Sequence, residues 1–494
     1  MSSDSQSSQK LHALDLPEIR LLIARFLTKQ ELAQCILVSQ KWSLGFLPLY
    51  WRHVDISLHK LARCHASTLQ RQGHHVRILS AGRIEDTSVF NQPSVSLVQE
   101  LDVMTCASRY QVDGGRGCLK EIVERNKASL AKLIWRCYGR DSIVGRPYRI
   151  WADMLEGLGN LVTLDLSNWS MTGLEFKEVL RNCPALKSLT LEASEEVSLS
   201  TAEGLIDDTT TDTDGAGCKG AEVLSARKEE FRHYGLERLE FVGNVIPSFL
   251  RYVPRIKHLT LRHFLHRDFG EMKDLLRKSP AGTLGELTHL TVLTGCSSSS
   301  SFMALINAIP QLVYFYGDVP PEVLDDFLEL IIQKHWQTIE HLILRDDPYN
   351  SPRFHFNFWR FFECCPQLVT LHIPFSLKDC VTWTSASPDI GSQDPVLRLF
   401  EPSKEWVCHD LKSLYLRIKD MDPMKPMDQI TFDLCLDRVF ASKVKRDQTK
   451  RTRSLLERMI FERLSGLEKL EKLNIGSIWY KYNQPTSPHT NTQH

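Results

Sequence analysis

Arginine, histidine and tyrosine residues alternate with leucines along many short segments of this sequence. The residues within or beside each L-x-L pattern include Arg238, His258, Arg262, His289, Tyr314, Tyr316, His341, Arg345, His372, Tyr415 and Arg417. On a strand these side chains point away from the leucines, because successive side chains face opposite sides. Aromatic residues and arginine are enriched at interface hot spots, and clustered arginine also suits acidic or phosphorylated segments. The pattern therefore predicts a protein-binding surface.

We expect the contacts with a bound target to come from six of these residues. They are Arg238, Arg262, Tyr314, Tyr316, His341 and Arg345. Strand surfaces also favour tyrosine and mixed charge through packing alone, and this simpler explanation stays open for each single residue.

The local signatures of common catalytic sites do not occur in the sequence. It contains no G-x-x-x-x-G-K, G-x-S-x-G, H-E-x-x-H or G-x-G-x-x-G pattern. The glycines of the stretch 114–117 predict a turn, and a calcium loop at Asp212 fails because its twelfth position would be Ala221. We expect no enzymatic activity, no cofactor and no metal site. A cysteine and a histidine that meet only in space remain the enzymatic alternative.

Composition restricts the kinds of partner and compartment. The chain of 494 residues has 60 Lys and Arg against 60 Asp and Glu, so it lacks the charge of a dedicated nucleic-acid binder. Its first ten residues are polar, and no apolar run approaches the roughly eighteen residues of a membrane span. The 13 cysteines contain no C-x-x-C pair, which favours reduced and mostly buried thiols, with Cys364 and Cys365 in packing roles. We expect a soluble protein of the cytoplasm or nucleus, without nucleic-acid or membrane partners.

The elements that would position the binding residues form a weak internal repeat of the type L-x-x-L-x-L. Its units are Val98-Leu101-Val103, Leu130-Leu133-Trp135, Leu161-Leu164-Leu166, Leu186-Leu189-Leu191, Leu236-Leu239-Phe241, Ile256-Leu259-Leu261, Leu287-Leu290-Val292, Leu312-Phe315, Ile339-Leu342-Leu344, Leu368-Leu371-Ile373, Leu411-Leu414-Leu416 and Leu470-Leu473-Ile475. Helical periodicity lies between several units, and four of them follow a proline, at 184, 254, 310 and 366, that would end a helix. Repeated strands and helices predict an α/β solenoid, with parallel strands on its concave side and helices on its convex side. An α/β domain with leucine-rich strands is the alternative.

The segment from residue 11 to residue 52 predicts three short helices. Pro17 suits a first helical turn, and Thr28 with Glu31 fits a capping box at the start of the second helix. The third helix should end before Pro48, and a short strand should follow from Arg52 to Ile56. So small a unit cannot enclose all of its apolar side chains, so part of this surface needs a partner.

This segment resembles an F-box almost position for position. The matching residues are Leu16-Pro17-x-Ile19, Phe26-Leu27, Leu32, Leu37-Val38-Ser39-x-x-Trp42 and Pro48-x-x-Trp51. The resemblance implies that Leu16, Pro17, Ile19, Ile23, Leu37 and Trp42 bind a Skp-family adaptor, which a cullin scaffold carrying a RING protein would hold. The chain would then be the substrate receptor of a ubiquitin ligase, acting in ubiquitin-dependent degradation. The alternatives are a scaffold that holds an adaptor without ubiquitin transfer, and helices that merely cap the larger domain.

The stretch from Leu161 to Leu191 resembles the leucine-rich repeats often found behind F-boxes. Met171-Thr172-Gly173-Leu174 and Asn182-Cys183-Pro184 carry this likeness, although Trp169 stands where that family usually has cysteine. The expected organisation is a disordered terminus (1–10), an F-box (11–52), a repeat region (53–480) and a polar tail (481–494). An acidic disordered insertion (192–230), a polar loop (297–301) and a second insertion (382–402) interrupt the repeats, and a basic run (443–453) could be a nuclear localisation patch.

Overall fold

The computed structural model describes residues 16–55, 66–82, 90–106, 112–138, 154–167, 173–192, 231–242, 247–262, 284–293, 299–345, 360–375, 406–418, 467, 469–475 and 478–481. The chain divides into two compact units, unit 1 (1–236) and unit 2 (237–494). The predicted disordered terminus, the acidic insertion beyond Glu192, the insertion at 382–402, the basic run and the polar tail beyond Lys481 lie outside the described residues.

Three helices begin the described part of unit 1, as predicted: α1 (Pro17–Ala24), α2 (Lys29–Val38) and α3 (Gln40–Arg52). The capping box is present, because the backbone N–H of Thr28 donates to the Glu31 carboxylate at 2.7 Å and the Glu31 N–H donates to Thr28 Oγ1 at 3.3 Å. Ser39 caps α3 with a single bond, its hydroxyl oxygen accepting from the Trp42 N–H at 3.2 Å. These caps fix where α2 and α3 begin.

The expected end of the third helix before Pro48 is wrong. Helix α3 continues through Pro48 to Arg52. A proline inside a helix leaves the carbonyl four residues earlier without its usual partner. That residue is Leu44, which is exposed, so water can take the hydrogen bond in place of the missing N–H.

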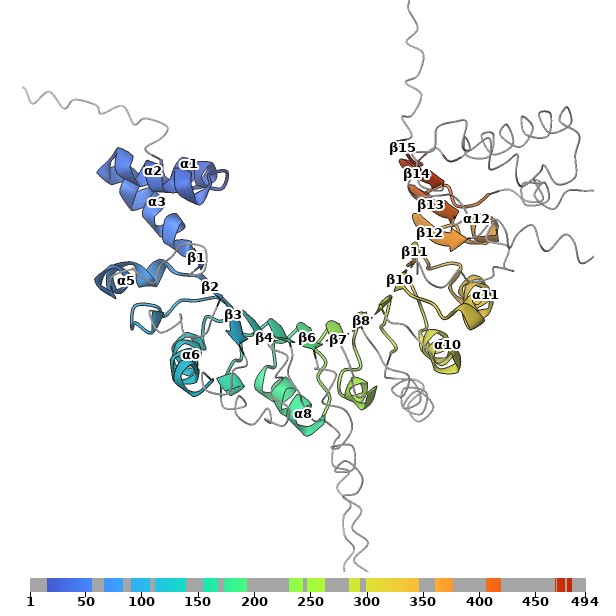
Figure 1. The fold of residues 1–494 in the computed structure, drawn as a ribbon, viewed down its shortest axis with the longest axis horizontal. Coiled ribbons are helices and arrows are strands. Elements are labelled where there is room, and N and C mark those ends of the chain that lie inside the picture. Colours follow the sequence, from blue (N-terminus) through green and yellow to red (C-terminus); the bar gives the residue numbers. More distant parts are fainter. Residues whose placement is uncertain are drawn as a thin grey trace, which may run out of the picture. The chain divides into compact units, whose positions relative to one another are not determined.

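The described strands of unit 1 pair in parallel and in chain order. They are β1 (His53–Asp55), β2 (Ile78–Ala81), β3 (Glu100–Cys106), β4 (Lys132–Tyr138), β5 (Thr163–Ser167) and β6 (Ser188–Glu192). The connections contain α5 (Ala66–Gln72), η3 (Gly73–His75), α6 (Val112–Asn126) and α8 (Gly173–Asn182). Helices α6 and α8 lie on one side of the strands (Figure 1).

Unit 2 repeats this arrangement. Its strands are β7 (Arg238–Val242), β8 (His258–Arg262), β9 (His289–Leu293), β10 (Tyr314–Gly317), β11 (His341–Leu344), β12 (Thr370–Phe375), β13 (Ser413–Ile418), β14 (Lys472–Ile475) and β15 (Ile478–Lys481). Strands β7 to β14 are parallel, and β15 is antiparallel to β14. The connections hold η6 (Pro247–Tyr252), α10 (Ser299–Ala308), η7 (Pro321–Val323), α11 (Leu324–His335) and α12 (Arg360–Cys364). The α/β solenoid predicted from the repeat is therefore confirmed within each unit.

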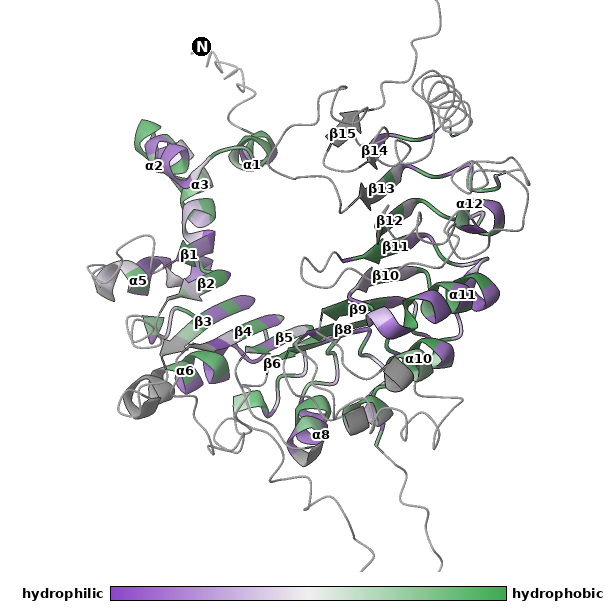
Figure 2. Ribbon diagram, turned by 45° about the vertical axis from the view of Figure 1, so that its right-hand side comes forward, coloured by the Kyte–Doolittle hydropathy of each residue, from purple (hydrophilic) through white to green (hydrophobic). Residues whose placement is uncertain are grey.

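Each predicted repeat unit forms a strand, and equivalent leucines pair across the sheet. In unit 2 this ladder is Leu239, Leu259, Leu290, Phe315, Leu342, Leu371, Leu414 and Leu473. Ladder positions such as Leu189, Leu259, Leu342 and Leu371 are buried. Along β3, Figure 2 shows polar residues alternating with apolar ones as purple and green bands, and the apolar residues Leu101 and Val103 are the buried ones.

The shared proline does end helices. In four connections the helix ends two residues before the proline, so one residue separates the helix from the proline. These helices are α8, η6, α10 and α12. Those pre-proline residues are Cys183, Val253, Ile309 and Cys365, and all four are fully buried. Cysteine thus occupies a position that valine and isoleucine fill elsewhere, which identifies Cys183 and Cys365 as packing residues.

Polar side chains at or just after the ends of two helices hydrogen-bond to the backbone of a residue that lies two positions before a strand begins. In unit 1 the Val98 N–H donates to Asn126 Oδ1 at 2.7 Å, and the Ser129 hydroxyl donates to the Val98 carbonyl at 2.8 Å. In unit 2 the Leu312 N–H donates to His335 Nδ1 at 3.2 Å, and the Thr338 hydroxyl donates to the Leu312 carbonyl at 2.9 Å. These bonds satisfy buried backbone groups that precede the sheet ladder.

Two local predictions are wrong. The glycine-rich stretch 114–117 belongs to α6 rather than to a turn, and Ser299–Ser301 form the first turn of α10 rather than a loop. In both cases a buried apolar face follows, with Leu119, Ile122 and Val123 in α6 and Phe302, Leu305 and Ile306 in α10. Burial of that face outweighs the poor helix propensity of glycine and serine.

Candidate partner-binding surfaces

The strand face of unit 2 consists of the side chains that point away from the leucine ladder. Its first row contains the residue before each ladder position, and its second row the residue after it. The first row is Arg238, His258, His289, Tyr314, His341, Thr370, Ser413 and Lys472. The second row is Glu240, Thr260, Thr291, Tyr316, Ile343, His372 and Tyr415.

Four rings of the first row lie against one another across strands β8 to β11. The ring centroids of His258 and His289 are 4.1 Å apart, those of His289 and Tyr314 are 5.6 Å apart and stacked, and those of Tyr314 and His341 are 5.7 Å apart. All four side chains are half-buried. The parallel register forces this contact, because it places the same position of each repeat beside its neighbour.

The surroundings lower the pKa of two of these imidazoles, those of His258 and His289. Burial lowers the pKa of His258, and the nearby His289 and Arg238 lower it further. Burial also lowers the pKa of His289, as does His341, and the Thr288 hydroxyl lies 2.9 Å from His289 Nδ1. Burial raises the pKa of Tyr314, so the rings of His258, His289 and Tyr314 themselves carry little charge near neutral pH.

A second pair of rings lies further along the sheet. The His372 and Tyr415 centroids are 5.2 Å apart, and His372 Nε2 lies 3.1 Å from the Ser413 hydroxyl. Burial lowers the pKa of His372, and the charge of Lys472 adds to this effect. The strand face is thus aromatic from β8 to β13.

The structure brings together only part of the predicted target-binding set. Arg238, Tyr314 and His341 share the first row, and Tyr316 lies in the second. Arg262 and Arg345 lie further along the strand direction, where each faces a carboxylate. Arg262 Nε is 2.8 Å from the Glu240 carboxylate, and Arg345 is 3.8 Å from Asp318. These two arginines are therefore less available to an acidic partner than their sequence positions suggested.

His258 and His289 complete the first row, although neither was among the six predicted contacts. They fill the gap between Arg238 and Tyr314. The six predicted contacts were chosen mainly as arginine and tyrosine residues, the types most common at interface hot spots. The sequence did place both histidines on the strand face, because each stands directly before a ladder leucine, but it gave no sign that their rings would stack.

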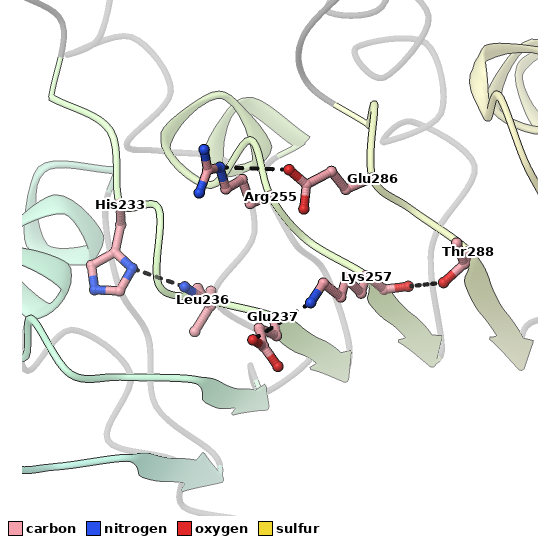
Figure 3. A network of polar contacts seen from close by, with 7 residues as sticks. All are labelled: His233, Leu236, Glu237, Arg255, Lys257, Glu286 and Thr288. Atoms are coloured by element: carbon pink, nitrogen blue, oxygen red, sulfur yellow. Dashed lines mark hydrogen bonds and ion pairs between the residues drawn. The ribbon is translucent and has the colours of Figure 1, made fainter.

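Ion pairs brace the loops that lead into β8 and β9. Arg255 lies 3.5 Å from Glu286 and Lys257 lies 3.6 Å from Glu237, while the Thr288 hydroxyl donates to the Lys257 carbonyl at 3.4 Å (Figure 3). The same view shows His233 of unit 1 accepting a hydrogen bond from the Leu236 N–H at 3.1 Å. Exposed pairs of this kind contribute little stability, but they position the start of the strands.

The strand face of unit 1 has a different character. Its second row reads Asp55, Ser80, Asp102, Ile134, Asp165 and Thr190. Burial raises the pKa of Asp102 in spite of the Arg136 charge, and Arg136 lies 3.9 Å from the Asp165 carboxylate. This face is acidic where the face of unit 2 is aromatic.

The N-terminal helices have a small core and much exposed apolar surface. Ala24, Leu32 and Phe46 form the core, and Trp42 packs against it with its ring 5.3 Å from that of Phe46. Seven of the eleven exposed large apolar side chains among the described residues lie in this segment: Leu16, Leu21, Leu22, Phe26, Leu37, Val38 and Leu44. Phe26 and Leu37 are 87% and 85% exposed.

The six predicted adaptor-binding residues fall into two groups. Leu16, Pro17 and Leu37 are exposed, whereas Ile19, Ile23 and Trp42 are half-buried. Trp42 belongs mainly to the helical core, so any contact with a partner would use only its outer edge. Phe26 was not among the six, although it is the most exposed of the apolar side chains.

Three of the cysteines in the described part of the chain are buried. Burial raises the pKa of Cys183, Cys365 and Cys408 to about 12, so these thiols are poor nucleophiles. The described part of the chain contains no group of three metal-ligating side chains. It also contains no helix with the length and hydropathy needed to cross a bilayer.

Comparisons with known proteins add little. No protein-family model matches the chain, and no curated protein matches it. Among solved structures, the chain is similar to that titled "Crystal structure of TLR13-ssRNA13 complex", with 13% identity and a TM-score of 0.31. The match covers 74% of this chain and 50% of that one, so the chain spans about half the length of that structure.

Proposed function

We propose that this protein is the substrate-recognition subunit of a Skp–cullin–F-box ubiquitin ligase. The N-terminal helices would dock on a Skp-family adaptor, and the strand face of unit 2 would hold the protein to be ubiquitylated. A receptor of this kind works by positioning its target and needs no active site of its own.

The observation that carries the proposal is the exposed apolar surface of the three helices. Isolated exposed leucines are common, but seven large apolar side chains between Leu16 and Leu44 are a concentration typical of a docking surface. The helices do not need these side chains for their own packing, because Ala24, Leu32 and Phe46 already form a core. A partner would remove the exposed side chains from water, which favours binding.

The supporting role of unit 2 follows from its residue types. The first row presents histidine and tyrosine side chains that are held by neighbouring strands, so little conformational freedom would be lost on binding. Aromatic residues of this kind often dominate binding energy at protein interfaces. The proposal places the protein in the cytoplasm or nucleus, where such ligases act.

Adaptor binding can be measured directly with purified full-length protein and a Skp-family adaptor. Leu37→Glu and Phe26→Glu should each weaken binding by at least tenfold, because each places a charge in an apolar interface. Leu97→Glu is the matched control, since Leu97 is also exposed but lies outside the helices. Equal affinity for the parent and both helix variants, or no measurable affinity in the parent, would refute the proposal.

A further inference from the structure

The first row of unit 2 concentrates basic and titratable groups between β7 and β11. Arg238, His258, His289 and His341 occupy equivalent positions, with Tyr314 between the last two histidines. The closest imidazoles have centroids 4.1 Å apart. The corresponding row of unit 1 reads His53, Ile78, Glu100, Lys132, Thr163 and Ser188, so it holds no such cluster.

The charged neighbours of the three histidines nearly balance. Arg238 and Lys257 act on His258 from β7 and from the loop before β8, and Glu237, which lies 3.6 Å from Lys257, opposes them. His289 is affected by His341, Arg238 and Glu340, the last of which favours its protonated form. Further along the strands, Arg262 is paired with Glu240 and Arg345 with Asp318. The change in the charge of the row with pH therefore depends mainly on the imidazoles.

Proton uptake by His258 and His289 is restrained in two ways. Packing against neighbouring strands removes water from the rings, and each protonated imidazole would repel the next one. Carboxylates placed along the row would cancel that repulsion and accept hydrogen bonds from the imidazolium N–H groups. Binding of an anionic partner and binding of protons must then strengthen each other, because coupling between two ligands is reciprocal.

We propose that the first row of unit 2 binds an acidic peptide segment and takes up protons as it does so. The inference rests on the proposed function, for which it names the class of target: proteins that present a run of glutamate or aspartate. Neighbouring strands lie about 4.8 Å apart, so a segment crossing β7 to β11 can reach each ring in turn. Acidification toward pH 5.5 should strengthen capture of such targets.

The test uses the purified full chain and a fluorescein-labelled peptide of ten glutamates at constant ionic strength. Glutamate stays ionised down to about pH 5.5, so a change in affinity above that pH reports on the protein. One proton taken up per complex gives at most about a tenfold change in affinity per pH unit. We expect binding to tighten at least tenfold between pH 7.5 and pH 5.5.

Variants and control peptides make the outcome specific. The double variant His258→Gln/His289→Gln should lose most of the pH dependence, whereas His409→Gln, an exposed histidine of unit 2 off the strand face, should keep it. Far-ultraviolet circular dichroism must show that the variants are folded. If the double variant is not folded, the single variant His341→Gln takes its place. A glycine–serine peptide should bind weakly at both pH values.

Three results would overturn the inference. They are no binding of the glutamate peptide, binding that does not change with pH, and the same pH dependence in parent and double variant. Tight binding of the glycine–serine peptide would also overturn it, because the face would then take neutral segments. Adaptor binding by the same proteins tests the proposed function separately, since the row lies in unit 2 and the docking helices in unit 1.

Discussion

Acidification should destabilise unit 2 through a single buried histidine, His335. Its side chain is fully buried at the end of α11, where Nδ1 accepts the hydrogen bond from the Leu312 N–H at 3.2 Å. A protonated ring has no free lone pair at Nδ1, so protonation would break this bond. Burial, with a smaller effect of the Lys334 charge, lowers the pKa of His335 from 6.5 to about 4.

The sign of the effect follows from proton binding in the two states. Above pH 6.5 the ring is neutral in folded and unfolded chains, so its contribution is unaffected by pH. Between pH 6.5 and pH 4 only the unfolded chain takes up the proton, so stability falls as the pH falls. With these two pKa values, the free energy of unfolding should drop by about 2.5 kcal/mol between pH 7.5 and pH 4.5.

The matched variant is His335→Gln. An amide oxygen can accept the same backbone hydrogen bond without titrating, as Asn126 does for the Val98 N–H in unit 1. The stability at each pH is measured by urea unfolding, with hydrogen exchange of the α11 amides as the probe. The proteins compared are the parent, His335→Gln and the exposed control His409→Gln. Other groups titrate in all three proteins, so the informative quantity is the difference between them. Parallel pH profiles for parent and His335→Gln would refute the reasoning.

Three further substitutions test the packing. Leu342→Ala should lower the free energy of unfolding by ~2–5 kcal/mol in thermal or urea melts, because it opens a cavity in the ladder; no loss would contradict the repeat core. Cys183→Val should change stability by less than about 1.5 kcal/mol, since Val253 fills the equivalent position; a larger loss would show a role beyond packing. Gly317→Ala should cost roughly 1–3 kcal/mol because a Cβ would collide with the Val292 carbonyl, and unchanged melting would contradict that contact.

The strands were predictable because their signal is local and repeated. All twelve leucine-rich units formed strands, since each places apolar side chains at fixed positions before and within the strand. Strand β2 was missed because its second core position is Ala81, which gives a weak apolar signal. Strand β15 was missed because nothing in its own sequence indicates that it turns back on β14.

The binding surfaces were less predictable than the strands. Sequence spacing placed Arg262 and Arg345 on the strand face, but their acidic partners, Glu240 and Asp318, come from neighbouring strands or loops. The stacking of His258 on His289 likewise depends on the register between strands that are 31 residues apart along the chain. The capping box of α2 was predictable because Thr28 and Glu31 lie within a single turn. Contacts across the sheet need the register, and spacing alone does not supply it.

The reversed strand β15 limits how copies of this protein can associate. Parallel strands β7 to β14 would offer, beyond β14, an open edge on which another molecule could continue the leucine ladder in register. Strand β15 occupies that edge with the opposite polarity, and it places Tyr480 rather than another leucine opposite Leu473. A second molecule that approaches from this side therefore meets a mismatched template. Strand β15 therefore ends the parallel leucine ladder at β14, so a further copy could not extend that ladder in the same register.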